Sequence, residues 1–470
     1  MSARSLSARA MRALPYVVAA TFFMEYLDST IIATALPAMA RSFHVGPNAL
    51  SLGMTAYMLT LAVFIPISGW AADRFGSRSV FAGAVTVFTA SSVLCGVAGS
   101  VDAFIAARVL QGLGGAMMVP VGRFIVVRNT ETGRMIRAIS TITWPAVAAP
   151  VVGPTVGGMI VTFASWHWIF LINLPLGLAV LGVIFAIVPQ QFGARRPMDW
   201  GGFVMGGAAL TAILLGTELA SDSHAGLALA GALVAGGLAL GTASLRHAAR
   251  QAHPLLDFRL MRHPTFAVTV LAGSLSRLTI DAVPYLVPLM LQVGFGLTAF
   301  HAGTLMLAFA LGNLGMKAFT TRILERFGFR ATAVVNATLG VLFVLLAGAM
   351  VPATPAAVLL LVLLGCGVTR SMQYTLLATL GYADIGDTEK GAASTLLSVN
   401  QQACIGLAVA FGALMLRLAA ALRGGQPTDG AFVPADFHYA FMIVAVPLAL
   451  SIPRYLRMDR AAGAALRAAS

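Results

Sequence analysis

The stretch ATAVVNATLGVLFVLLAGAMVPATPAAVLLLVLLGCGVT, residues 331–369, contains no Asp, Glu, Lys or Arg. A helix needs about 20 apolar residues to cross a hydrocarbon core about 30 Å thick, so this stretch is long enough for two crossings. The segment VPATP at 351–355 interrupts it with two prolines, which are typical turn residues. We therefore predict two membrane-spanning helices joined by a tight turn.

The composition extends this interpretation to the whole chain. Of its 470 residues 59% are apolar and only 10% are charged, and the mean hydropathy is +0.87. A soluble domain of this length needs more charge on its wet surface. We predict an all-α membrane protein with fourteen spans, at residues 14–36, 49–70, 79–99, 102–124, 138–160, 167–188, 199–219, 225–245, 265–291, 300–320, 331–350, 356–380, 392–417 and 436–457.

The distribution of basic residues predicts the orientation in the membrane. If the N-terminus is cytoplasmic, most of the 30 Lys and Arg residues fall in segments on the cytoplasmic side. This asymmetry predicts that both termini are cytoplasmic. We expect the protein in the inner membrane of a bacterial cell. The formal net charge of +13 is then a topology signal, and we expect no nucleic-acid partner.

A short internal repeat relates two parts of the chain. Asp73-Arg74-Phe75-Gly76-Ser77-Arg78 follows the second predicted span, and Glu325-Arg326-Phe327-Gly328-Phe329-Arg330 follows the tenth. Internal repeats of this kind are typical of secondary transporters. We predict an N-terminal six-helix bundle at 1–190, two inserted helices at 191–246, a cytoplasmic connector at 247–263, and a C-terminal six-helix bundle with a short tail at 264–470.

Several charged residues fall inside predicted spans, where a charge is costly and is functional by default. Counted from the same side of the membrane, Asp28 in the first span and Arg108 in the fourth lie at depths of roughly 12 Å and 9 Å, so they could meet. Glu25 lies one turn from Asp28 on the same helix face. Arg123, at the inner end of the fourth span, is expected at the membrane interface.

The second part of the chain carries Arg277, Asp281 and Arg370 within its predicted spans. Arg277 and Asp281 are four residues apart and can neutralise each other on one helix, whereas Arg370 has no partner on its own helix. Both arginines could instead face an anionic or polar group of a substrate. The aromatic residues near these charges either line a cavity or belong to the core and the lipid-facing surface. The candidate cavity residues are Tyr26, Tyr57, Gln111, Arg277, Asp281, Arg370 and Tyr374.

The sequence lacks the motifs of two other function classes, ATP-driven pumps and metalloenzymes. Neither Lys317 nor Lys390, the only lysines, follows a glycine, so the chain has no GxxxxGK[ST] phosphate loop of an ATP-driven pump. The eight histidines form no HExxH pattern, and the three cysteines stand at unrelated spacings. We expect no metal site, no cofactor and no enzymatic activity.

Five local patterns are LDSTIIATALP at 27–37, GWAADRFGSR at 69–78, RVLQGLGG at 108–115, APVVGPTVGG at 149–158 and SWHWIFLINLP at 165–175. Together they resemble motifs of the major facilitator superfamily, and within it the fourteen-span drug:proton antiporter family, over nearly the whole chain. Ser77 and Ala149 depart from the usual patterns, because the family places a basic residue and a glycine there.

The resemblance implies an exporter that exchanges drugs or other amphipathic small molecules for protons by alternating access. It links Arg108 to proton coupling. Because a carboxylate inside the membrane is costly and functional by default, we expect Asp28, or Glu25 beside it, to carry the proton. It also implies a gating motif of Gly69, Asp73, Arg74, Gly76 and Arg78, repeated as Glu325, Arg326 and Gly328, and an antiporter motif of Gly153, Pro154, Gly157 and Gly158.

Two alternatives stay open. Other members of the family export metabolites or metal chelates, and the arginines within spans suit an anionic substrate. A transporter-like membrane sensor would bind without turnover, but it would need neither a titratable carboxylate in mid-membrane nor two matching loop motifs, which favours transport. The expected partners are a small-molecule substrate, protons and the lipid bilayer, while a periplasmic adaptor and an outer-membrane channel are left open.

Overall fold

The computed structural model describes residues 8–45, 47–193, 196–221, 227–423 and 432–467, without the side chains of some residues inside helices. These residues form helices joined by short turns, and the described part of the chain contains no strand. The helices are α1 (Ala8–Phe43), α2 (Pro47–Phe64), α3 (Ile67–Phe75), α4 (Ser77–Gly96), α5 (Val101–Asn129), η1 (Thr132–Arg134), α6 (Met135–Thr143), α7 (Pro145–Phe163), α8 (Trp168–Leu171), α9 (Asn173–Ile187), α10 (Trp200–Ser221), α11 (Leu227–Arg250), η2 (Phe258–Arg262), α12 (Pro264–Leu289), η3 (Met290–Gly294), α13 (Ala299–Gly348), α14 (Ala356–Leu380), α15 (Lys390–Leu422), α16 (Pro434–Leu456) and α17 (Ala464–Arg467).

The hairpin predicted from residues 331–369 is confirmed. Helix α13 ends at Gly348 and α14 begins at Ala356, because Pro355 fixes the backbone just before the new helix. In the turn between them, the Val351 amide donates a hydrogen bond to the Thr354 hydroxyl at 2.9 Å. The two helices then pack along each other, as a short turn requires.

Ten helices in the described part of the chain are long and apolar enough to cross a membrane, or eleven if the bent pair of α2 and α3 counts as one span. The two helices of that pair meet at an angle of 60°. Helix α13 has 50 residues, and Gly328 interrupts its helical geometry. Its two parts cover the predicted spans 300–320 and 331–350.

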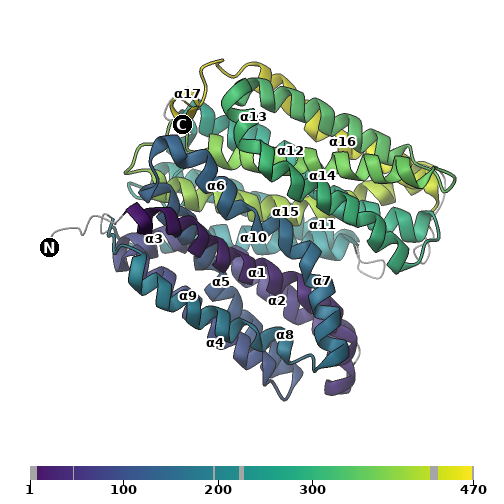
Figure 1. Cartoon of the computed structure of the whole chain (residues 1–470), viewed down its shortest axis with the longest axis horizontal. Helices are drawn as coiled ribbons and strands as arrows, with labels where there is room; N and C mark the ends of the chain where they lie inside the picture. Colours follow the sequence, from purple (N-terminus) through teal and green to yellow (C-terminus); the bar gives the residue numbers. More distant parts are fainter. Residues whose placement is uncertain (1–7, 46, 194–195, 222–226, 424–431, 468–470) are drawn as a thin grey trace.

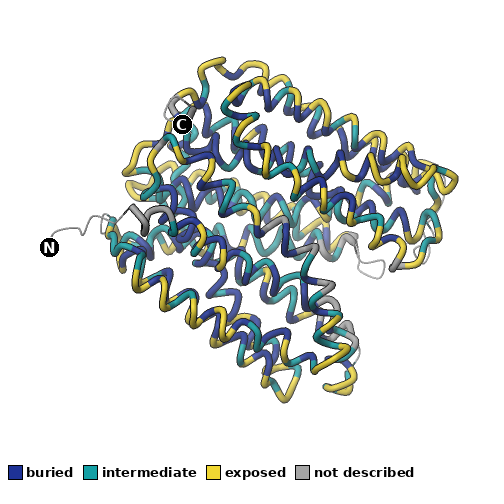
Figure 2. The backbone as a smooth tube through the Cα atoms, in the orientation of Figure 1, coloured by how far each residue is buried: buried dark blue, intermediate teal, exposed yellow. Residues whose placement is uncertain are grey.

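The helices form two groups, which we call the N-terminal half (α1–α9) and the C-terminal half (α12–α17). Both termini lie at the same end of the molecule, where the two halves come together, and the halves separate toward the opposite end (Figure 1). In each half the buried residues follow the inner faces of the helices, while exposed residues follow the outer faces (Figure 2). Large apolar side chains such as Phe185 and Leu361 are more than 60% exposed on those outer faces, as lipid contact requires.

Helices α10 and α11 pack against each other and close one side of the seam between the halves. The ring of Phe203 on α10 lies 5.5 Å from that of Phe64 on α2. On the other side of α10, the Leu214 side chain contacts Gly406 of α15. The inserted pair therefore touches both halves through α10, while α11 lies on its outer side.

The internal repeat is also seen in the backbone. Gly76 (φ 87°, ψ 139°) and Gly328 (φ 76°, ψ 169°) both occupy a region that is essentially restricted to glycine. In each half, a segment that follows a long helix packs on this turn: the segment after α9 in the N-terminal half and the segment between α16 and α17 in the C-terminal half. The Gly193 amide donates to the Asp73 carbonyl oxygen at 3.0 Å, and Gly463 contacts the Phe329 ring.

Candidate functional site

A buried ion pair joins α1 and α5 in the N-terminal half. The Arg108 guanidinium donates hydrogen bonds to the Asp28 carboxylate and to the Gln111 side-chain oxygen, both at 2.6 Å. The Gln111 amide donates in turn to the second Asp28 oxygen at 2.9 Å. All three side chains are at most 1% exposed, so they depend on protein groups and not on water for their hydrogen bonds. The sequence prediction that Asp28 and Arg108 could meet agrees with this geometry.

Further polar groups surround this pair. The Asn173 side-chain amide donates to Asp28 at 3.3 Å and to the Ser92 hydroxyl at 2.9 Å. The Arg108 guanidinium lies 4.2 Å from the centre of the Tyr57 ring, a cation–π distance. Sequence reasoning did not select Asn173 or Ser92. Each is a polar residue in an otherwise apolar run, and such a residue inside a membrane needs a partner.

Glu25 has a different environment from Asp28. Its side chain is only 6% exposed, and one carboxylate oxygen has no hydrogen-bond partner in the described part of the chain. The Tyr57 hydroxyl is also buried without a partner, and both groups lie beside the surface of Gly115. No cation lies within ion-pair distance of Glu25 among the described residues. The two acids of the first helix are therefore unequal, because Asp28 has a cation and Glu25 does not.

A second cluster of charges lies in the C-terminal half. The Asp281 carboxylate accepts a hydrogen bond from Arg370 at 3.1 Å, and its two oxygens share the hydrogen of the Tyr374 hydroxyl at 2.7 and 2.8 Å. The possibility of an Arg277–Asp281 pair on one helix is wrong for this conformation, because Asp281 is bound from α14. Arg277 instead lies 4.7 Å from the centre of the Tyr374 ring, and one of its terminal nitrogens is buried without a partner.

Tyr26 connects the two clusters. Its side chain lies close to Gln401 on α15 and within electrostatic range of both Glu25 and Arg277. The Gln401 side-chain oxygen also accepts a hydrogen bond from Arg123 at 3.2 Å. The prediction that Arg123 lies at the membrane interface is therefore wrong: the residue is 4% exposed because the C-terminal half covers it.

The predicted gating residues lie where the halves meet. Gly69 contacts Thr395 of α15, and a larger side chain would not fit between these helices. Asp73 is within electrostatic range of Arg196 and Arg128. The other gating residues lie along the turns of the two repeats: Arg74 faces Trp70 at 5.9 Å, Arg78 is partly buried, Glu325 is partly buried and Arg326 is exposed.

The antiporter motif packs α7 against α1. Gly153 contacts the Thr30 side chain, and the Thr30 hydroxyl donates to the Ala149 carbonyl oxygen at 3.2 Å. Gly157 is also buried, whereas a side chain added at Gly158 would point into open space. The side chain of Pro154 lies outside the described residues. The three described glycines of the motif thus do not share one packing role.

Residues 18–413 match the family model of the Major Facilitator Superfamily. The chain belongs to the major facilitator superfamily. It is similar to proteins named "Putative multidrug resistance protein MdtD" from Salmonella heidelberg (strain SL476) and Salmonella typhimurium (strain LT2), with 37% identity over 439 residues in each. The match covers 93% of this chain and 92% of each relative.

Solved structures of other facilitators share the fold. The human organic anion transporter MFSD10 (TETRAN) aligns with a TM-score of 0.67 and 16% identity, covering 95% of this chain and 99% of that one. The proton:xylose symporter XylE aligns with a TM-score of 0.64 and 14% identity, covering 96% of both chains. The match to the family model and to the Salmonella relatives makes this facilitator a multi-pass membrane transporter and not an enzyme.

Proposed function

We propose that this facilitator exports amphipathic small molecules in exchange for protons, by alternating access. The observation that carries the proposal is the pair of buried acids on α1, of which Asp28 is bound to Arg108 and Glu25 has no cation. Acids buried in a membrane protein are costly and typical of proton relays. The name of the Salmonella relatives, which share most of the chain's length, supports drugs as the substrate class.

The unequal acids suggest how exchange is coupled. An ionised carboxylate without a cation is costly to bury, whereas the Asp28 carboxylate is compensated by Arg108. When the halves rock, the Asp28–Arg108 bond has to loosen before Asp28 can take a proton. Loss of the proton on the other side then lets the acids attract a cationic substrate or lets Asp28 pair again with Arg108. One site serves both ligands in turn, which is the requirement for exchange.

The proposed topology has fourteen spans with both termini in the cytoplasm of a bacterial cell. It is supported by the break in α13 at Gly328 and by the positive charge of the predicted inside segments. Single cysteines at Ala252 and Ser223 test it, because the native cysteines Cys95, Cys366 and Cys404 are buried. We expect an impermeant thiol reagent on intact cells to label the Ser223 position and to spare the Ala252 position. Labelling of both from one side would contradict fourteen spans.

Export of an organic anion is a second candidate, and the C-terminal cluster favours it. The cluster holds two arginines, Arg277 and Arg370, and one acid, Asp281. Arg370 binds this acid, whereas one Arg277 nitrogen has no partner among the described residues. An excess of buried guanidinium groups is stabilised by an anionic group in the cavity. The two candidates differ in the charge of the transported molecule, so one experiment can distinguish them.

The experiment uses the full-length protein in liposomes with an imposed pH gradient. A labelled lipophilic cation and a labelled organic anion are offered in separate arms. We expect wild-type protein to move the cation uphill, Asp28→Asn to abolish uphill movement, and Glu25→Gln to reduce it less. Glu131→Gln is the matched control, because Glu131 is an exposed acid outside the cluster.

Exchange of substrate without a pH gradient is measured in the same liposomes. Retained exchange by Asp28→Asn shows that the variant is folded and binds substrate, so that its defect lies in coupling. If Asp28→Asn drives the cation uphill and Glu25→Gln does not, the proton belongs to Glu25. If both variants drive it, the acids of the first span are not the coupling site. Uphill movement of the anion alone favours the second candidate.

A further inference from the structure

A basic groove lies between the halves at the end of the molecule that bears the termini. It has a volume of about 1010 Å³ and is bounded by α6 and the adjoining turn on one side and by α13 on the other. Lys317 of α13 crosses the seam beside it, because its ammonium group donates to the Thr143 hydroxyl at 2.9 Å. The groove therefore lies at a direct contact between the two halves.

The groove carries a surplus of positive charge. Four of its residues are basic (Arg134, Arg137, Lys317 and Arg322), and only Glu325 is acidic. Arg134 has a distant partner, Glu131, at 3.7 Å. In the described part of the chain, no carboxylate lies within ion-pair distance of the other three cations. Guanidinium groups without a carboxylate are suited to bind a phosphate, which they can hold with two parallel hydrogen bonds.

Apolar side chains line the same groove. Trp144 is 43% exposed and Phe319 is 56% exposed, and both are lining residues. Aromatic residues at this kind of position are typical of the boundary between lipid tails and headgroups. A soluble anion has no apolar part that would contact these side chains, whereas a phospholipid has both a phosphate and acyl chains.

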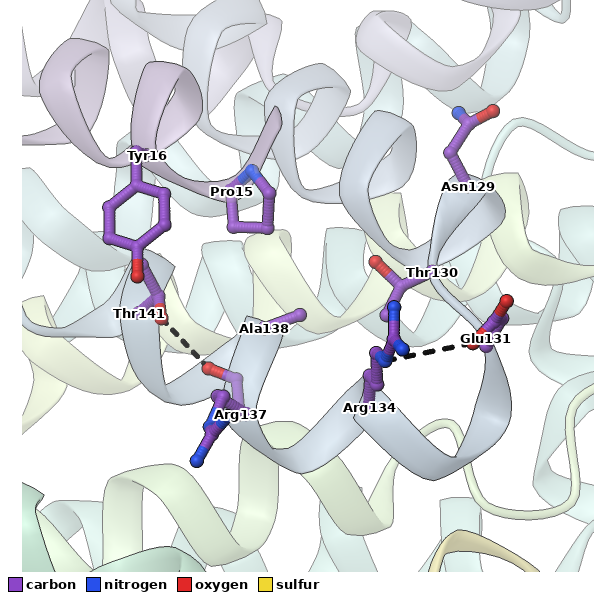
Figure 3. A pocket seen from close by; sticks show the side chains of 9 residues that line it. All are labelled: Pro15, Tyr16, Asn129, Thr130, Glu131, Arg134, Arg137, Ala138 and Thr141. Carbon is purple, nitrogen blue, oxygen red and sulfur yellow. Dashed lines mark hydrogen bonds and ion pairs between the residues drawn. The ribbon is translucent and has the colours of Figure 1, made fainter. Parts of the chain in front are cut away.

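A smaller cavity of about 380 Å³ adjoins the groove and shares Arg134, Arg137 and Thr141 with it. Figure 3 shows the ring of Tyr16, from α1, pointing toward Thr141 of α6, and Arg134 paired with Glu131. Tyr16 is 68% exposed, so a third aromatic side chain flanks the same two arginines. The basic groove thus continues toward the outer surface of α1.

We propose that this groove binds the headgroup of an anionic phospholipid from the leaflet on the side of the termini. The phosphate lies between Arg137 of the N-terminal half and Arg322 of the C-terminal half, and the acyl chains lie along Trp144 and Phe319. Basic pockets between membrane helices bind such headgroups, and each cation near the surface adds to the attraction. A lipid in this position bridges the halves and stabilises the conformation in which they meet at this end.

The test is a lipid titration of the full-length protein in detergent, followed by native mass spectrometry. The probes are dioleoylphosphatidylglycerol, dioleoylphosphatidylcholine and soluble glycerol 3-phosphate. We expect tight binding of phosphatidylglycerol alone, and about thirtyfold weaker binding in the double variant Arg137→Gln/Arg322→Gln. Arg137→Lys/Arg322→Lys keeps the charge and should keep most of the affinity.

The matched control is Arg454→Gln/Arg457→Gln. These two arginines line another groove, where Asp384 and Asp459 balance their charge. We expect this control to bind phosphatidylglycerol like wild type. The proposal is overturned if Arg137→Gln/Arg322→Gln binds as tightly as wild type, or if the control loses affinity equally. It is also overturned if glycerol 3-phosphate displaces the lipid at similar concentration, because the groove would then be a site for soluble anions.

Discussion

Arg108 is one of the largest side chains that are almost fully enclosed in the described part of the chain, at 1% exposure. Its charge is compensated by Asp28 at 2.6 Å and by the face of the Tyr57 ring at 4.2 Å. A buried ion pair of this kind adds little net stability over apolar packing, but removal of one partner leaves an uncompensated charge. Such a pair is suited to a mechanism that makes and breaks it.

We expect Arg108→Ala to lower the free energy of unfolding by about 3–5 kcal/mol, because Asp28 then retains only amide donors. The double variant Arg108→Ala/Asp28→Asn buries no charge, so its loss should be smaller than the sum of the single losses. Thermal unfolding in detergent measures the stability, and liposome transport measures the coupling. Uphill transport should be lost in all three variants. Additive stability losses would show that the two side chains do not depend on each other.

Some contacts of the site could be predicted from the sequence and others could not. The Asp28–Arg108 contact could be predicted, because the depth of a residue in the membrane follows from its position along the helix. The Asp281–Arg370 contact was not, because the rotation of α12 against α14 is set by packing that no local pattern encodes. Arg123 stands near the end of a predicted span, where snorkelling to water is usual, and only the C-terminal half that covers it removes that option.

At the scale of the elements, charge-free runs were enough to predict the helices but not their bends. The 60° bend between α2 and α3 and the break between α6 and α7 both lie inside predicted spans. Pro66 and Pro145 stand at these places, and a proline lacks the amide that a continuing helix needs. A proline inside an apolar run permits a bend without requiring one, so the angle had to come from the packing.

We expect Gly76→Ala and Gly328→Ala each to destabilise the protein by about 1–3 kcal/mol, because both glycines have positive φ and a ψ that other residues avoid. Both turns join helices of a gating motif, so transport should fall as well. The matched control is Gly83→Ala within α4, where an added methyl group meets nothing within 4 Å and the helix should gain about 0.5–1 kcal/mol. Thermal unfolding in detergent measures all three. Equal stability of the Gly76 and Gly83 variants would contradict this role of the turn.

At the scale of the whole molecule, a set of polar contacts holds the halves together at the end that bears the termini. Arg123 donates to Gln401 at 3.2 Å, and Ser394 donates to the Pro120 carbonyl oxygen at 2.8 Å. Lys390 donates to the Val127 carbonyl oxygen at 3.3 Å. Each of these bonds runs from α5 to α15. Opening of this end breaks them together, so each one biases the balance between the two conformations of an alternating-access cycle.

We therefore expect Arg123→Gln to favour opening at this end. The loss of one charge-assisted hydrogen bond, about 1.5 kcal/mol, corresponds to roughly a tenfold shift in the equilibrium. Spin labels at Arg74→Cys and Arg326→Cys report the separation, because these exposed residues occupy matching positions in the two halves. Double electron–electron resonance on the wild-type protein should give mainly one short distance between the two spin labels. The Arg123→Gln variant should add a longer distance. Arg250→Gln, an exposed charge at the end of α11, is the control. If both variants give the wild-type distances, Arg123 does not hold the halves together, and closure of this end rests on the backbone contacts of Ser394 and Lys390.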